Sequence, residues 1–421
     1  MSAAGRSREL PPAFVIDSGS IAGLQSARIL ARHGVPVIGI GRPNHPYCRT
    51  RACRQVIHSP IAGGQFIELL EKLGPKLDQP AVVLATQDLV VLHLSRHRER
   101  IAPWFRVALP SHELVETLLD KVRFYRLALE RGFPIPPTRF VNNREDLLEA
   151  PDTLRFPAVL KPAIRTERWR QLSAEKVYKV ESRQALLDRY EQVRDWSDEL
   201  IVQEWIEGGE ENLYSCNAYF DASSRPVATF VARKLRQWPP YSGSSCLGEE
   251  CRNDEVLRET IHLFQSVGFH GLAYLEMKRD PRTGRHYILE PNIGRATGRS
   301  GIAEGGGVEL HYAMYADLAG LPLPAQLEQR YTGVKWICLR RDFQAALRKW
   351  LRGEIRLRDW RESWRAPRVW ADFSWSDPAP FIYDVLAVAA ALFRARGRTF
   401  LRRFATPRAD RPAPEVSYLA D

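Results

Sequence analysis

The segment that most constrains the fold is residues 13–40, AFVIDSGSIAGLQSARILARHGVPVIGI, because it predicts a parallel sheet. An apolar run is followed by a turn containing glycine, a helical pattern that ends at Gly34, and a second apolar run. This strand–helix–strand order implies two parallel strands joined by a crossover helix. Residues 81–94 repeat the pattern, with Thr86 and Asp88 placed to cap the following helix.

Length, hydropathy and cysteine usage indicate a multidomain protein of the cytoplasm. The chain has 421 residues, enough for several domains with their own cores. No run approaches ~20 consecutive apolar residues, so no transmembrane helix is predicted. The first residues lack the apolar stretch of a secretory signal, and the six scattered cysteines indicate reduced structural thiols.

The net charge of +11 is concentrated near the C-terminus. Residues 331–421 contain 18 Lys/Arg and 10 Asp/Glu, whereas the first 330 residues are close to neutral. An acidic partner would therefore be met mainly by this basic segment, which also holds six of the eleven tryptophans.

The middle of the chain predicts an antiparallel α+β body. A helix is expected from Leu114 to Gly132, and strands are expected in four later segments: 156–162, 199–221, 227–240 and 271–292. Together with the first segment, this pattern predicts an α/β domain followed by an α+β domain.

The last of these segments is a hairpin that carries two carboxylates. Glu276 and Glu290 lie fourteen residues apart around a turn at 281–284, so antiparallel pairing places them on one face. Asn292 shares that face by strand alternation, while Pro291 is expected to end the sheet ladder. Two carboxylates and an amide oxygen suit Mg²⁺ bound to nucleotide phosphates. The alternative to a metal site is an ordinary strand end followed by a solvated turn.

Two lysines fit the same interpretation. Lys161 ends an apolar strand and Lys121 opens a helix. Each alone is typical of a solvated surface lysine, but beside a metal site both would neutralise phosphates. Residues 203–208, QEWIEG, offer backbone groups that could contact an adenine edge.

The order of these motifs resembles that of the ATP-grasp enzymes. The matching segments are LLDKVRFYRLALERGFPIPPT (118–138), FPAVLKP (156–162), VQEWIEGGEE (202–211), YLEMK (274–278) and ILEPN (288–292). The resemblance implies a Rossmann-like pre-ATP-grasp domain (1–112), a lid subdomain with its preceding helix (113–205) and a metal- and nucleotide-binding subdomain (206–330). The basic, Trp-rich helical extension that follows (331–421) is not a feature shared with the family.

The resemblance also assigns roles to individual residues. ATP would be held by Lys121, Lys161, Glu204, Trp205, Ile206 and Glu210. The ribose hydroxyls fall to Glu210, with Glu211 as its rival. Mg²⁺, or Mn²⁺ in its place, would be held by Glu276, Glu290 and Asn292. The catalytic cations would be Arg233 (with Lys234 or Arg236 as rivals), Arg295 and Arg299, which face the transferred phosphate or a substrate carboxylate.

The chain departs from the family pattern at two places. The segment after Lys161 has no glycine, whereas relatives cover the phosphates with a glycine-rich lid. Gly294 stands where an arginine is expected, so that role falls to Arg295 or Arg299. The glycines at 294, 298, 301 and 305–307 are expected to let backbone N–H groups approach an anion.

The implied activity is that of a carboxylate–amine ligase of the D-aspartate ligase-like type. ATP would activate a small-molecule carboxylate as an acylphosphate, which an amine, with an amino acid expected among the substrates, converts to an amide. Two alternatives are a bicarbonate-activating carboxylase and an ATP-binding module that docks nucleic acid or anionic membrane through its basic tail. For the ligase no nucleic-acid partner is expected, a homodimer is implied by the relatives, and residues 381–404 are the candidate for peripheral contact with an anionic membrane.

Overall fold

A computed structural model describes residues 9–391, apart from 43, 164–166, 174, 176, 241 and 242. Its N-terminal part is a five-stranded parallel sheet of order β3-β2-β1-β4-β5, which confirms the predicted parallel sheet. The strands are β1 (Ala13–Ile16), β2 (Val37–Gly41), β3 (Gln55–His58), β4 (Ala81–Leu84) and β5 (Phe105–Arg106). The helices around them are α1 (Ile21–Arg32), α2 (Gln65–Leu73), α3 (Asp88–Arg96) and α4 (Arg98–Ile101).

The predicted caps of α3 are wrong. The residue at the N-cap position of α3 is Gln87, and no side chain caps the helix there. The Thr86 hydroxyl instead donates to the Ile16 carbonyl at 3.0 Å, which links the ends of the neighbouring strands β4 and β1. Asp88 is the first residue of α3, and its carboxylate accepts a hydrogen bond from Arg295.

The single helix expected from Leu114 to Gly132 is two helices, α5 (His112–Leu119) and α6 (Lys121–Glu130). Asp120 between them has extended backbone, and its Oδ1 accepts from the N–H groups of Val122 and Arg123. An aspartate in this position satisfies the first free N–H groups of a helix. The break therefore fixes Lys121 in the first turn of α6.

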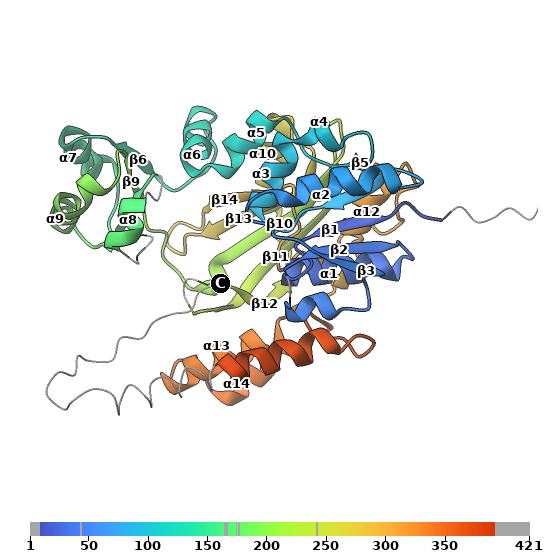
Figure 1. The fold of residues 1–421 in the computed structure, drawn as a ribbon. Helices are drawn as coiled ribbons and strands as arrows, with labels where there is room; N and C mark the ends of the chain where they lie inside the picture. Colours follow the sequence, from blue (N-terminus) through green and yellow to red (C-terminus); the bar gives the residue numbers. More distant parts are fainter. Residues whose placement is uncertain are drawn as a thin grey trace, which may run out of the picture.

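A small antiparallel sheet of order β6-β9-β7-β8 lies to one side of the molecule (Figure 1). Its strands are β6 (Thr138–Val141), β7 (Ala158–Pro162), β8 (Tyr178–Val180) and β9 (Leu200–Glu204), with helices α7 (Arg144–Thr153), α8 (Glu167–Leu172) and α9 (Arg183–Val193). The glycine-free segment after Lys161 includes α8, whose Trp169 is fully buried and packs against Tyr178 and Trp196. This sheet has its own apolar core.

The central sheet has seven strands in the order β14-β13-β10-β11-β12-β15-β16. They are β10 (Leu213–Phe220), β11 (Pro226–Trp238), β12 (Ser244–Glu250), β13 (Gly271–Arg279), β14 (His286–Ile293), β15 (Lys335–Ile337) and β16 (Arg368–Trp370). All neighbours are antiparallel except β15 and β16. The helices that follow in this region are α10 (Asp254–Ser266), α11 (Ile302–Gly305) and α12 (Leu310–Leu318). One apolar cluster joins the parallel sheet to the central sheet, including Phe14, Phe66, Phe220 and Phe264.

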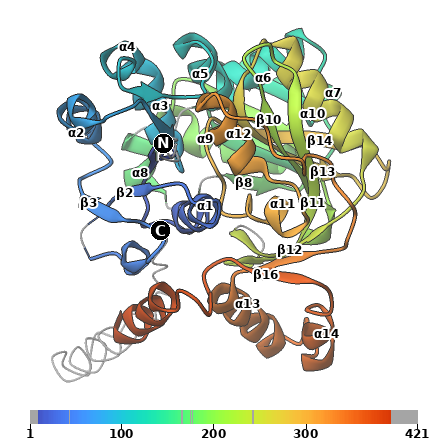
Figure 2. The same ribbon diagram turned by 90° about the vertical axis from the view of Figure 1, so that its right-hand side faces the viewer.

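The basic C-terminal segment adds the last two strands of the central sheet and then forms a layer at one end of the molecule. This layer contains α13 (Leu339–Leu351), α14 (Leu357–Glu362) and a helix at 379–391 (Figure 1, Figure 2). In the described part of the chain, every helix is too short or too polar to cross a bilayer.

Candidate nucleotide and metal site

The two hairpin carboxylates are direct neighbours across the sheet. Glu276 of β13 pairs in register with Glu290 of β14, and Tyr274 pairs with Asn292. The ladder does not stop at Pro291, as the sequence suggested, but continues to Ile293. Because β14 is the edge strand, the missing N–H of Pro291 leaves no partner strand unsatisfied. The sheet therefore holds Glu276, Glu290 and Asn292 on one face.

Two lysines flank this pair. Lys234 Nζ lies 3.0 Å from Glu276 Oε1, and Lys121 Nζ lies 3.7 Å from Glu290 Oε2. Burial alone would raise the pKa of Glu276, but the charges of Lys234 and Arg299 and two hydrogen bonds hold it below its usual value. Glu276 is thus an anion in a buried setting.

The donor set fits Mg²⁺ carried by nucleotide phosphates. Like charges opposed on a sheet repel, so the Glu276–Glu290 register favours a cation between them. In the described residues, no cluster of three His, Cys, Asp or Glu side chains forms a self-sufficient metal site. Two carboxylates and the Asn292 amide suit Mg²⁺, which takes few protein ligands and completes its shell with phosphates and water.

The alternation of side chains along β11 places Arg233 on the face of the sheet opposite to Glu276. Ser215 of β10 pairs with both Glu276 of β13 and Ala232 of β11, so Ala232 lies on the Glu276 face. Lys234 is two residues further and shares that face, whereas Arg233 points to the other one. Arg233 instead donates through Nε to Glu249 at 2.6 Å. Of these two residues, Lys234 and not Arg233 is therefore on the face that carries Glu276.

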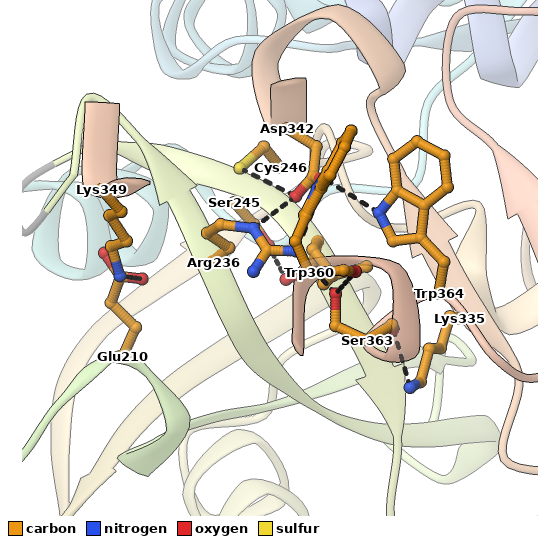
Figure 3. A network of polar contacts seen from close by, with 11 residues as sticks. Glu210, Arg236, Ser245, Cys246, Lys335, Asp342, Lys349, Trp360, Ser363 and Trp364 are labelled. Carbon is orange, nitrogen blue, oxygen red and sulfur yellow. Dashed lines mark hydrogen bonds and ion pairs between the residues drawn. The ribbon is translucent and has the colours of Figure 1, made fainter. Parts of the chain in front are cut away.

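The other rival, Arg236, belongs to a buried structural network (Figure 3). Its Nε donates to Asp342 Oδ1 of α13 at 2.7 Å, and the side chains are 5% and 0% exposed. The indole N–H groups of Trp360 and Trp364 each donate to Asp342 Oδ2 at 2.9 Å. Arg236 therefore fastens α13 and the α14 region to the central sheet.

Lys161 sits in a hydrogen-bonded group that links the small sheet to β14. Its Nζ donates to Gln203 Oε1 at 3.0 Å and to the Tyr125 hydroxyl at 3.3 Å. Tyr125 in turn donates to the Leu289 carbonyl, directly before Glu290. Burial and the charge of Lys121 lower the pKa of Lys161 to about 7, against the opposite effect of Glu290.

Gln203 and Tyr125 were missed by the sequence analysis. Gln203 is buried, and its amide N–H donates to the Thr138 hydroxyl at 2.7 Å, which orients the carbonyl oxygen toward Lys161. The signal for Gln203 was its place directly before the hinge motif EWI on a strand that neighbours β7. Tyr125 lies one helical turn after Lys121, on the side of α6 that is buried.

The three residues expected to contact adenine, Glu204, Trp205 and Ile206, lie at the end of β9 and directly after it. The Glu204 N–H donates to the Pro137 carbonyl and the Trp205 N–H to the Pro157 carbonyl. The Glu204 carboxylate accepts from the Arg155 N–H at 2.8 Å. Among the three hinge N–H groups in the described chain, only that of Ile206 has no backbone hydrogen bond, so it is the donor left for a ligand.

Glu210 does not point into open solvent. Its side chain is 6% exposed, and Oε2 accepts from Lys349 Nζ of α13 at 2.7 Å (Figure 3). Lys349 was also missed, because no local pattern connects residue 349 with a segment 139 positions earlier.

Arg295 links α3, beside the parallel sheet, to β14 of the central sheet. It donates through Nε to Asp88 and through Nη2 to Asn292 Oδ1. A cavity of ≈150 Å³ opens here, and its lining includes Lys121, Glu290 and Asn292. Gly294 has φ +64°, and a Cβ there would lie 2.1 Å from Leu109 Cδ2. A side chain at 294 is therefore excluded, and this explains the displaced arginine.

Arg299 is buried beside Glu276. Its Nη2 donates to the hydroxyls of Ser215 and Tyr274, each at 2.6 Å, while its Nε has no partner among the described residues. The expected approach of backbone N–H groups to an anion is wrong for Gly294 and for 305–307, because their N–H groups donate to backbone carbonyls.

Curated proteins that resemble the chain include ligases and formyltransferases. A D-aspartate ligase from Enterococcus faecium (strain Aus0004) is 29% identical over 247 residues, covering 54% of this chain and 57% of that protein. A D-alanine--D-alanine ligase from Pseudomonas putida (strain GB-1) is 22% identical over 187 residues, covering 41% and 54%. The chain thus spans little more than half the length of these relatives. No protein-family model matches it.

Solved structures resemble most of the chain. An ADP complex of N5-carboxyaminoimidazole ribonucleotide synthetase has a TM-score of 0.59 at 17% identity, covering 82% of this chain and 87% of that one. The biotin carboxylase domain dimer of Hydrogenobacter thermophilus 2-oxoglutarate carboxylase, complexed with MgADP, ADP and bicarbonate, has a TM-score of 0.59 at 13% identity, covering 77% and 74%. At these identities the likeness establishes a shared fold.

Proposed function

We propose that this chain, which has the ATP-grasp fold, is an ATP-dependent carboxylate–amine ligase. The observation that carries the proposal is the register of Glu276 with Glu290, with Asn292 on the same face and a lysine beside each carboxylate. A fold or docking role needs no such arrangement, because carboxylates opposed on a sheet destabilise it unless cations neutralise them.

In the proposed reaction, a substrate carboxylate attacks the γ-phosphoryl group of ATP, giving an acylphosphate and ADP. An amine then attacks the acyl carbon, so that the C–N bond forms, phosphate leaves and the amine loses a proton. Mg²⁺ held by Glu276, Glu290 and Asn292 would supply charge neutralisation on the phosphates.

The protein's own cations would bind and orient the phosphates. Lys161 and Lys121 would act as point charges on the nucleotide side, with Lys161 kept in place by Gln203 and Tyr125. Lys234, on the Glu276 face, would contact the transferred phosphate, and Arg299 would stabilise charge beside it. Arg295, fixed by Asp88 and Asn292, would meet an anionic group of the substrate.

The nucleotide base and ribose would lie between the small sheet and the central sheet. Ile206 would donate its N–H to adenine, with Glu204 and Trp205 shaping the hinge around the ring. Glu210 would accept from the ribose hydroxyls while Lys349 holds its carboxylate.

For the substrates, we propose a small carboxylic acid and an amine, with an amino acid as one of the two. The likeness to a D-aspartate ligase supports an amino acid as the acid component. A bicarbonate-activating role has support from the fold of the biotin carboxylase domain. ADP release in the presence of bicarbonate alone would favour that second function.

Two contacts are proposed in addition. The helix at 379–391 exposes Ile382, Tyr383, Val385 and Leu386, which supports peripheral contact of residues 381–404 with anionic membrane. Residues 392–404 lie outside the described residues. A homodimer is the second contact, and sedimentation velocity measures it directly.

The test of the function is ADP release screened against pairs of carboxylic acids and amines. A ligase releases ADP and phosphate in equal amounts only when both substrates are present, and mass spectrometry then finds the amide. ATP binding without substrate-dependent ADP release for any pair would support the ATP-binding module instead.

A further inference from the structure

Helix α13 has an apolar stripe on its outer side. Its inner side, with Asp342, Ala345 and Ala346, is buried. The outer side carries apolar residues that are 43–71% exposed: Phe343 (53%), Leu347 (43%), Trp350 (46%) and Leu351 (71%). Their spacing of i, i+4, i+7 and i+8 puts them on one helical face. A helix on a free surface normally presents polar residues there.

The stripe continues onto α14. Leu357 at the start of α14 is 53% exposed, and a cavity of ≈40 Å³ between the two helices is lined only by apolar and aromatic side chains. These lining residues are Phe343, Ala346, Leu347, Trp350, Ile355, Leu357 and Trp360. We call Phe343, Leu347, Trp350, Leu351 and Leu357 the α13–α14 patch. Contiguous exposed apolar surface of this kind marks an interaction site.

The surroundings of the patch are strongly basic. Residues 339–370 contain ten Lys/Arg and four Asp/Glu. Of these acids, Asp342 is buried with Arg236, while Asp359 and Glu362 are within salt-bridge distance of Arg356 and Arg358. The exposed cations therefore outnumber the exposed anions around the apolar side chains.

We propose that the α13–α14 patch docks on the surface of an anionic lipid bilayer. Apolar side chains would enter the boundary between headgroups and acyl chains, and the arginines would meet lipid phosphates. Trp350 has the amphipathic ring that is favoured at this depth.

The charge pattern disfavours the other occupants. A symmetric contact with a second copy of this chain would place one basic surface against another. A nucleic acid would use the arginines but leave the four leucine and phenylalanine side chains of the patch in water. An anionic bilayer is the partner that satisfies both the apolar and the basic component.

The patch extends the membrane contact proposed above for residues 381–404. Arg340 of α13 forms an ion pair with Asp384 of the helix at 379–391, and both helices belong to the same end layer (Figure 1, Figure 2). The inference does not depend on the ligase activity, because no residue of the patch belongs to the nucleotide site.

The experiment is co-sedimentation of the full-length protein with vesicles of phosphatidylcholine, with and without phosphatidylglycerol. The variants are Leu347→Glu and Leu351→Glu. The matched control is Leu129→Glu, whose side chain is 45% exposed and belongs to α6, a helix that lies away from the end layer (Figure 1). Thermal unfolding of each variant, expected within a few degrees of the wild type, verifies the fold.

We expect the wild type and Leu129→Glu to pellet with the anionic vesicles alone, and each patch variant to lose roughly tenfold in partition. Three results would overturn the proposal. The wild type could remain in the supernatant at low salt. The patch variants could pellet like the wild type, which would show that another segment makes the membrane contact. Sedimentation velocity could show an oligomer that Leu351→Glu dissociates, which would make the patch a self-contact. ADP release is measured separately, so a failure here is distinct from a failure of the proposed ligase function.

Discussion

Lys349 Nζ lies 2.7 Å from Glu210 Oε2, and this ion pair joins a helix near the C-terminus to the segment directly after the hinge. Both side chains are largely shielded from water, at 18% and 6% exposure, so solvent screens the pair weakly. The part of the chain after residue 330 is therefore in contact with the proposed ribose site.

Lys349→Met should weaken ATP binding through Glu210. Removing a charged hydrogen bond costs about 1.5–3 kcal/mol, so the KM for ATP should rise roughly tenfold or more. The measurement compares ATP with 2′-deoxy-ATP, because a displaced Glu210 should make the variant less sensitive to the missing hydroxyl. Arg352→Met, an exposed cation just after α13, is the control. Equal losses with both nucleotides would show that Lys349 acts on stability alone.

Glu290→Gln should abolish ligation while preserving the fold, because it keeps the shape of the side chain and removes one charge. We expect kcat to fall by at least about 100-fold, since even indirect partners of a metal ligand cost 10–100-fold. Glu255→Gln is the control for damage to β14. The Glu255 carboxylate, on α10, lies 2.7 Å from His286, which is on the same strand as Glu290, and the substitution removes its charge. Near-normal amide formation by Glu290→Gln with Mg²⁺ would exclude the metal assignment.

ATP affinity should fall as the pH rises above 7, because of Lys161. Its pKa of about 7 in the free protein means that the ammonium loses its proton above that pH, whereas bound phosphates require the charged form. Binding must then take up a proton, and Kd should rise up to about tenfold per pH unit. Calorimetry in buffers of different ionisation enthalpy measures this uptake.

Lys161→Arg should remove this pH dependence, since a guanidinium stays charged. Lys179→Met is the control, because Lys179 of β8 pairs with Glu181, two residues later, at 2.9 Å. This variant should bind ATP like the wild type. Proton uptake that persists unchanged in Lys161→Arg would assign it to another group.

Asp342→Ala should destabilise the protein strongly. It leaves the buried Arg236 guanidinium without its carboxylate and removes the acceptor of two indole N–H groups. Breaking a buried pair costs about 3–5 kcal/mol, whereas the exposed Asp359→Asn should cost less than about 1 kcal/mol. Urea unfolding followed by tryptophan fluorescence measures both. A double variant, Arg236→Met with Asp342→Leu, should recover most of the loss.

The sequence predicted the parts of the site that depend on local pattern. The register of Glu276 and Glu290 follows from the length of one hairpin, and the parallel sheet follows from one strand–helix–strand segment. Lys161 was identified because it ends an apolar strand. These features are set by residues close together in the chain.

The predictions that were wrong concern features that depend on residues far away in the sequence. The choice between Arg233 and Lys234 required the pairing of β11 with β10 and of β10 with β13, which alternation within β11 alone cannot provide. The burial of Arg236 required Asp342, more than a hundred residues later. The course of the ladder past Pro291 required knowing that β14 is an edge strand.

The last strands of the central sheet also determine when, during translation, the edge of β12 can be covered. β12 pairs on one side with β11, and its other side is covered by β15, through the register of Leu247 with Ile337. During translation the chain grows at about 5–20 residues per second, so β12 waits several seconds with an open edge after it has been made. An open edge is a template for wrong pairing with other chains. The ribosome must therefore synthesise the chain as far as β15 (Lys335–Ile337) before the open edge of β12 can be covered.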